Sequence, residues 1–281
     1  MKNSFLISLI AFLFLNLQVV AQTNETKNLM KDNFSLQAAL EVFKNSDSPE
    51  DFEVKLNEEG SHVSNLDLNN DGEIDYIKVM DEAEKDAHAI VLQAVLGEDD
   101  VQDIAVIAIE KTGEEEAMLQ IFGDEKIFGE NMIVELFETE ASQSTDERGP
   151  NGELHLTRVF VNVWFWNPVR FIYRPVYRPY RSPFYWNYYP QTFRPRRPIG
   201  VRSYLGFASV YRSRYRVVRT PRVAYARSVY TPRRRTSSRL QRRSVVRPRT
   251  NARSPQRNNS IRQRNNRNRR ARARNNRRRR N

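Results

Sequence analysis

Two nearly continuous apolar runs, HAIVLQAVL at residues 88–96 and DIAVIAIE at residues 103–110, decide the fold class. Their length and their content of Val and Ile are typical of β-strands. The short acidic turn GEDD at residues 97–100 separates them, which favours an antiparallel pair. Strands this apolar need neighbours on both sides and a cover over the sheet. We therefore expect them in the middle of a sheet that helices cover on one face.

Three further β-rich runs flank this pair, at residues 74–80, 118–122 and 132–137. The connections between successive runs are short and contain Gly, Asp or Glu, as in an antiparallel meander. The sequence thus predicts four or five strands.

Two helices are expected before the strands. Ser35 can cap a helix whose apolar side is formed by Leu36, Ala39, Leu40 and Phe43. Ser48 can cap a second helix, because Pro49 suits the first helical position. We therefore expect residues 35–140 to form an acidic α+β domain in which two N-terminal helices pack on a four- or five-stranded antiparallel sheet.

The charges are divided along the chain. Between Glu25 and Glu153 there are 34 acidic and 9 basic residues, which gives a net charge of −25. From Leu154 to Asn281 there are 36 Arg and no Asp, Glu or Lys. The formal net charge of +12 therefore describes neither half of the chain.

Residues 1–21 are typical of a signal peptide. A short basic start precedes an apolar run that is too short for a good membrane span, and Val19 and Ala21 suit cleavage before Gln22. An uncleaved membrane anchor is the alternative. The absence of Cys is compatible with export to the periplasm, the cell envelope or the medium. Residues 22–34 are expected to be a flexible lead.

The second half of the chain is expected to be less regular. Residues 141–153 are polar and indicate a linker. Residues 154–195 are rich in Tyr, Trp, Phe, Arg and Pro, and the recurring Pro interrupts regular pairing. Residues 196–281 have few aliphatic side chains and many Arg, so we expect a disordered tail.

The stretch DLNNDGEIDYIK at residues 67–78 has the composition of a calcium loop. Oxygen ligands recur at alternate positions around Gly72, as hard cations require. An EF-hand would end in Glu, where this chain has Lys78. The DxNxDGxxD pattern instead resembles the calcium loops of integrin-type β-propeller repeats, in which the ninth position is a ligand. The expected ligands are Asp67, Asn69, Asp71, Glu73 through its carbonyl, and Asp75. A metal-free turn built by Asp and Asn side chains is the alternative.

The sequence does not favour an enzyme. The chain has three His without metal-ligand spacing, and it has no nucleophile elbow, phosphate-binding loop or dinucleotide fingerprint. We therefore expect a non-enzymatic protein without a small-molecule substrate.

The Arg-rich tail predicts binding to polyanions outside the cytoplasm. Guanidinium groups bind phosphate bidentately and stack on aromatic rings. Extracellular DNA, acidic glycan and anionic lipid head groups are the expected partners. The candidate contacts are Arg233, Arg234, Arg235, Arg242, Arg243, Arg269, Arg270, Arg277, Arg278, Arg279 and Arg280. One alternative is a tail neutralised by its own acidic domain, and another is a structural protein that self-associates through domain and tail.

The order of these features resembles a group of uncharacterised secreted bacterial proteins. The resemblance rests on SPEDFE at residues 48–53, DLNNDGEIDYIKV at residues 67–79, and VNVWFW at residues 161–166 followed by Arg, Tyr and Pro. It covers roughly residues 35–190 and implies export, but it implies no known activity.

Overall fold

The computed structural model of the 281-residue chain describes residues 30–129, 132–142 and 155–245. The described residues up to Gln241 form one compact unit. The strands are β1 (Ile77–Glu84), β2 (Ala87–Val95), β3 (Val101–Lys111), β4 (Ala117–Gly123), β5 (Ile133–Ser142), β6 (His155–Phe160) and β7 (Tyr215–Val218). The helices are α2 (Leu36–Lys44), α3 (Pro49–Asn57), α4 (Glu125–Phe128), α5 (Asn167–Ile172), α6 (Val201–Ala208), α7 (Ala224–Tyr230) and α8 (Ser238–Val245), with 3-10 turns at Glu59–Ser61, Ser209–Arg214 and Thr231–Arg233.

The two expected N-terminal helices begin at their predicted caps. The Ser35 hydroxyl accepts a hydrogen bond from the Ala38 N–H at 3.1 Å at the start of α2. The Ser48 hydroxyl accepts one from the Asp51 N–H at 3.2 Å at the start of α3. These side chains satisfy N–H groups that have no partner within the helix.

The prediction of an α+β fold with an antiparallel sheet is confirmed, but the predicted number of strands is wrong. The sheet has seven strands: six follow the order β1-β2-β3-β4-β5-β6, and β7 pairs with β5 off this path. The extra strands arise because β5 is long. Its first part pairs with β4 and β7, and its second part pairs with β6.

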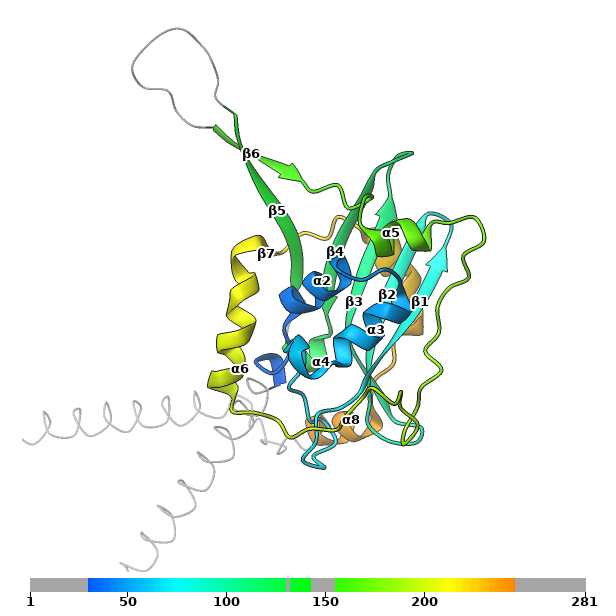
Figure 1. The fold of residues 1–281 in the computed structure, drawn as a ribbon, viewed down its shortest axis with the longest axis vertical. Coiled ribbons are helices and arrows are strands. Elements are labelled where there is room, and N and C mark those ends of the chain that lie inside the picture. Colours follow the sequence, from blue (N-terminus) through cyan, green and yellow to red (C-terminus); the bar gives the residue numbers. More distant parts are fainter. Residues whose placement is uncertain (1–29, 130–131, 143–154, 246–281) are drawn as a thin grey trace, which may run out of the picture. The chain divides into compact units, whose positions relative to one another are not determined.

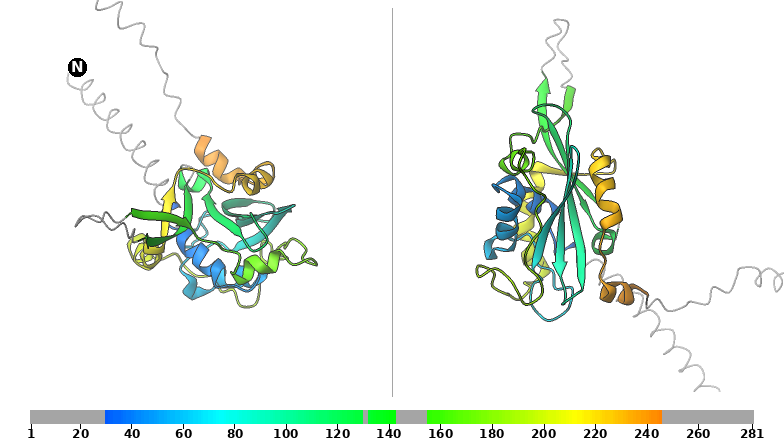
Figure 2. Two further views of the ribbon diagram at one scale, coloured as in Figure 1. Left: turned by 90° about the horizontal axis from the view of Figure 1, so that it is seen from above. Right: turned by 90° about the vertical axis from the view of Figure 1, so that its right-hand side faces the viewer.

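Helices cover both faces of the sheet, whereas we expected a cover on one face. The blue helices α2 and α3 lie on one side of the strands, and α7 lies on the other (Figures 1 and 2). The first core joins Phe43 and Phe52 to Ile90 and Ile107. The second core packs the sheet face against α7, and its members include Ala89, Val91, Val106, Ala108, Ala226, Val229 and Tyr230. This second cover explains why every residue of β2 is buried.

The expectation of disorder from residue 196 onward is wrong for residues 196–245, which include three helices and β7. The aliphatic and aromatic side chains of this segment are few, but those of α7 recur at helical spacing. Ala226, Val229 and Tyr230 therefore form one apolar side that packs on the sheet. Composition averaged over 86 residues hides such a pattern. Residues 246–281 lie outside the described part, so the expectation for them stays a prediction.

The aromatic segment also folds with the domain. Val163, Trp166 and Val169 belong to the same core as α2 and α3. Further along, Arg181 forms an isolated bridge with Met80, and the Asp81 N–H donates to the Tyr180 carbonyl at 2.7 Å. The chain thus covers the outer edge of β1, which would otherwise expose unpaired backbone groups.

The limits of the expected segments also shift. Phe34, which we placed in a flexible lead, is buried and forms a bridge with Ser64. Strand β5 extends to Ser142, two residues beyond the expected end of the domain. The signal segment and most of the expected linker, residues 143–153, lie outside the described residues.

Candidate functional site

The predicted calcium loop folds as a network of side chains that accept hydrogen bonds from its own backbone. The Asp67 carboxylate accepts from the Asp71 N–H at 3.2 Å and from the Gly72 N–H at 3.0 Å. The Asp71 carboxylate accepts from the Glu73 N–H at 2.8 Å. Gly72 has a φ of 89°, a conformation that favours glycine, and it allows the sharp turn.

Asp75 lies beneath this network. Its carboxylate is buried and accepts a hydrogen bond from the Leu68 N–H at 2.6 Å. Burial, together with the negative charges of Asp67 and Asp71, raises the pKa of Asp75 to about 8. The negative charges of Asp67 and Asp71 thus act on the Asp75 carboxyl group, and a cation would offset this repulsion.

The other two predicted calcium ligands, Asn69 and Glu73, show no arrangement that points to a metal ion. The Asn69 amide donates to the Asp71 carboxylate at 2.7 Å, and Glu73 is exposed. Within residues 30–129, 132–142 and 155–245, no three His, Cys, Asp or Glu side chains are placed to hold a metal ion. Calcium sites also use asparagine and backbone carbonyl oxygens, so calcium at this loop stays a proposal.

The arginines near residue 234 contact the acidic domain rather than solvent alone. Arg233 Nε lies 3.3 Å from a Glu82 carboxylate oxygen, and Arg234 Nε lies 2.6 Å from one of Asp124. We had expected both to contact a polyanion; both also form ion pairs with the acidic domain, and the expectation stays a prediction. Arg242 and Arg243 lie in α8, and the other candidates, from Arg269 to Arg280, lie outside the described residues.

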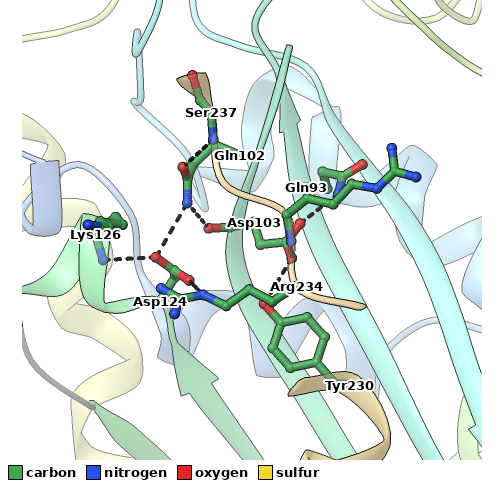
Figure 3. A network of polar contacts seen from close by, with 9 residues as sticks. Gln93, Gln102, Asp103, Asp124, Lys126, Tyr230, Arg234 and Ser237 are labelled. Atoms are coloured by element: carbon green, nitrogen blue, oxygen red, sulfur yellow. Dashed lines mark hydrogen bonds and ion pairs between the residues drawn. The ribbon is translucent and has the colours of Figure 1, made fainter. Parts of the chain in front are cut away.

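A buried polar network anchors this segment to the sheet (Figure 3). The Asp103 carboxylate accepts hydrogen bonds from the Gln93 amide at 2.6 Å, the Tyr230 hydroxyl at 2.9 Å and the Arg235 N–H at 2.7 Å. The Ser237 N–H donates to the Gln102 side chain at 3.0 Å. Burial raises the pKa of Asp103.

Sequence reasoning missed this network, although a signal was present. Gln93, Gln102 and Asp103 interrupt the two apolar runs of β2 and β3, and all three are buried. Buried polar side chains need hydrogen-bond partners, so their presence in such strands indicates a partner over that face.

A second buried polar cluster lies on the other face of the sheet. His88 Nδ1 lies 2.8 Å from an Asp81 carboxylate oxygen, and the Tyr177 hydroxyl donates to the same oxygen at 2.9 Å. The rings of His88 and Tyr173 also meet edge to face. This cluster joins β1 and β2 to the aromatic segment.

Comparison of the chain with protein-family models, with curated proteins and with solved structures found no match. In the described part of the chain, no helix has the length and apolar character needed to cross a membrane.

Proposed function

We propose that this is an exported, non-enzymatic protein whose C-terminal Arg-rich segment, residues 246–281, binds extracytoplasmic polyanions. Residues 30–245 serve as the folded support for that segment. Extracellular DNA, acidic glycan and anionic lipid head groups share the dense negative charge that such a segment recognises.

The distribution of charge carries this proposal. Residues 154–245 contain 21 Arg and no acidic residue. Their positive charge nearly balances the net charge of −25 carried by residues 25–153. Ion pairs join the two regions at Glu41, Glu82, Asp100, Asp124 and Glu135. Residues 246–281 add 15 Arg and no acidic residue. The positive surplus of the protein therefore belongs to this last segment.

A variant that ends at Val245 tests the proposal. The full mature chain should bind DNA with an affinity that falls steeply with salt, by roughly 10³-fold between ~50 and ~200 mM, because binding releases counterions. The shorter variant should lose most of this binding. Fluorescence anisotropy with a labelled DNA duplex, heparin and anionic vesicles distinguishes the three partners.

A full-length variant with Lys in place of every Arg in residues 246–281 serves as the matched control. It keeps the charge but loses bidentate and stacking contacts, so it should bind more weakly than the native chain. Equal affinity would show that charge alone matters. Undiminished binding by the variant that ends at Val245 would refute the proposal.

Self-association is the second candidate, and the ion pairs between the two halves of one chain favour it. The same pairs can form between chains if the C-terminal half of one molecule docks on the sheet of another. Sedimentation at low salt without added polyanion separates the two functions, because an assembler forms larger species alone and a binder does not.

We also propose that the loop of Asp67, Asn69, Asp71, Glu73 and Asp75 binds calcium. The buried Asp75 carboxylate beside two others supports it. A ligand bound only by the native state raises stability as RT ln(1 + [L]/Kd). With a Kd of roughly 10⁻⁴–10⁻³ M, ~10 mM calcium should stabilise the protein by about 1–3 kcal/mol.

Thermal unfolding in EDTA and in calcium checks this prediction. Asp71→Ala should remove the calcium-dependent increment, whereas Asp99→Ala in an exposed turn should keep it. An unchanged melting temperature of the native protein between the two conditions would reject the site.

A further inference from the structure

A cavity of about 290 Å³ lies on the face of the sheet that α7 covers. Met80 and Val91 contribute apolar surface to it, and Gln93 and Asp103 contribute polar groups. Arg181, Arg233 and Arg235 also line it. These residues come from three strands and from two segments of the Arg-rich half, so the cavity exists only in the folded chain.

The register of the strands places the polar residues side by side. Lys78 is paired with Gln93 across β1 and β2, and Gln93 is paired with Asp103 across β2 and β3. A register shift at Leu92 and Gln93 adjusts the pairing at this point. Such bulges redirect side chains, and they are frequent beside binding sites.

The carboxylates of the cavity are already satisfied. Glu82 accepts two hydrogen bonds from Arg181, at 2.8 and 3.0 Å, and it also forms the ion pair with Arg233. Asp103 accepts three hydrogen bonds, from Gln93, Tyr230 and Arg235. Glu82 therefore has two cationic partners, whereas these three donors to Asp103 are neutral.

Positive charge remains beside them. Within the described part of the chain, the side chains of Lys78 and Arg235 form no hydrogen bond or ion pair. The pKa of the Lys78 ammonium is lowered mainly by burial and to a smaller extent by the nearby Arg235 guanidinium. Three arginines thus line the cavity with two carboxylates, and a bound anion would relieve the repulsion between Arg235 and the nearby Lys78.

One acceptor at the cavity also lacks a donor. The side-chain oxygen of Gln93 is buried and has no hydrogen-bond partner within the described chain. Its amide nitrogen is held by Asp103, which fixes the orientation of the group. A hydroxyl group that enters beside Gln93 would satisfy this oxygen, which is costly to leave unpaired.

We propose that this cavity binds a monosaccharide that carries one anionic group. The anion contacts Arg235 and is attracted by the nearby Lys78, a ring hydroxyl donates to Gln93, and the ring packs on Met80 and Val91. The volume is at the lower end of the range for ligand sites, which suits a single sugar ring. A sugar carboxylate and a sugar phosphate share this chemistry. The site is independent of residues 246–281, since all its residues precede Gln241.

Calorimetry of the full mature chain at ~150 mM salt tests the proposal with four probes: glucuronate, glucose 1-phosphate, glucose and inorganic phosphate. Either glucuronate or glucose 1-phosphate should bind saturably. Binding of glucuronate would show that the site takes a carboxylate, and binding of glucose 1-phosphate that it takes a phosphate. Glucose and inorganic phosphate should bind about tenfold more weakly or not at all, because each lacks half of the recognised chemistry.

Matched variants locate the binding. Arg235→Gln should lower the affinity for the anionic sugar about tenfold. Lys78→Gln should lower this affinity as well. Arg202→Gln, with the same charge change at an exposed residue of α6, should leave it unchanged. Equal affinity for inorganic phosphate, an equal effect of Arg202→Gln, or no saturable binding of either sugar would overturn the inference.

Discussion

At the scale of single residues, Glu53 joins three segments of the chain. One carboxylate oxygen accepts hydrogen bonds from the Tyr76 and Ser182 hydroxyls, both at 2.6 Å. The other accepts from the Val79 N–H at 2.9 Å. Burial raises the pKa of this carboxyl group despite these hydrogen bonds. The native state therefore binds the Glu53 proton more tightly than the unfolded chain does.

A pH dependence follows from that raised pKa. Between the unfolded pKa and the higher folded pKa, the native state holds more protons, so the free energy of unfolding falls as pH rises through this window. One group contributes at most about 1.4 kcal/mol per pH unit. Glu53→Gln should remove the contribution of Glu53 to this slope, because an amide does not titrate, and should keep that of Asp75. The amide can still accept from Val79 and donate to the hydroxyls.

Urea unfolding between pH 4 and pH 8 measures the effect. Glu98→Gln, at an exposed position of the 97–100 turn, is the control and should keep the slope of the native protein. Parallel stability profiles of the native protein and Glu53→Gln would contradict the prediction.

At the scale of elements, the pairing of β7 with β5 depends on a buried ion pair. Glu135 and Arg216 are register partners, and Arg216 Nε donates to the Glu135 carboxylate at 2.8 Å. Glu135 is only 4% exposed. Gln120 also donates to it at 2.7 Å. A carboxylate in such a place requires a cation, since an unpaired buried charge is strongly destabilising.

Arg216→Met should therefore destabilise the protein by roughly 1–3 kcal/mol, as measured by urea unfolding, because Arg222 Nε, 3.9 Å from the other Glu135 oxygen, offsets only part of the buried charge. The double variant Arg216→Met, Glu135→Met should recover part of the loss, because it removes the buried charge as well. Arg219→Met, at an exposed position just beyond β7, controls for the loss of a surface charge. A similar small effect of Arg216→Met and Arg219→Met would show that the pair is not important for stability.

At the scale of the whole molecule, the C-terminal half is part of the fold. Helix α7 covers Ala89, Val91, Val106 and Ala108 of the sheet. A chain that ends at Pro195 lacks this cover and exposes an apolar sheet face to water. A chain that ends at Val245 retains it.

The chain that ends at Pro195 should therefore melt at a markedly lower temperature and bind a hydrophobic dye, because apolar burial is the main favourable term in folding. The chain that ends at Val245 should melt like the native protein. Circular dichroism and dye fluorescence compare the three chains. Equal melting temperatures of the native chain and the chain that ends at Pro195 would mean that α7 contributes little.

The sequence alone determined the features that depend on near neighbours. The runs at residues 88–96 and 103–110 predict β2 and β3 because they are short, nearly continuous in apolar side chains and rich in Val and Ile. Ser35 and Ser48 cap helices because their hydroxyls reach N–H groups three residues away. The hydrogen bond from the Asp71 N–H to the Asp67 carboxylate spans four residues and has the same short range. These contacts are local, so a pattern within one window of sequence specifies them.

Only the tertiary structure decided which distant residues meet. Tyr230 and Asp103 are 127 residues apart, and Arg234 and Asp124 are 110 apart. Nothing in the composition of residues 196–245 distinguishes an arginine that contacts this domain from one that contacts an external polyanion. The outcome depends on which carboxylates the sheet buries opposite each guanidinium. That geometry arises from strand register and from the packing of α7, and neither is encoded within a local window of sequence.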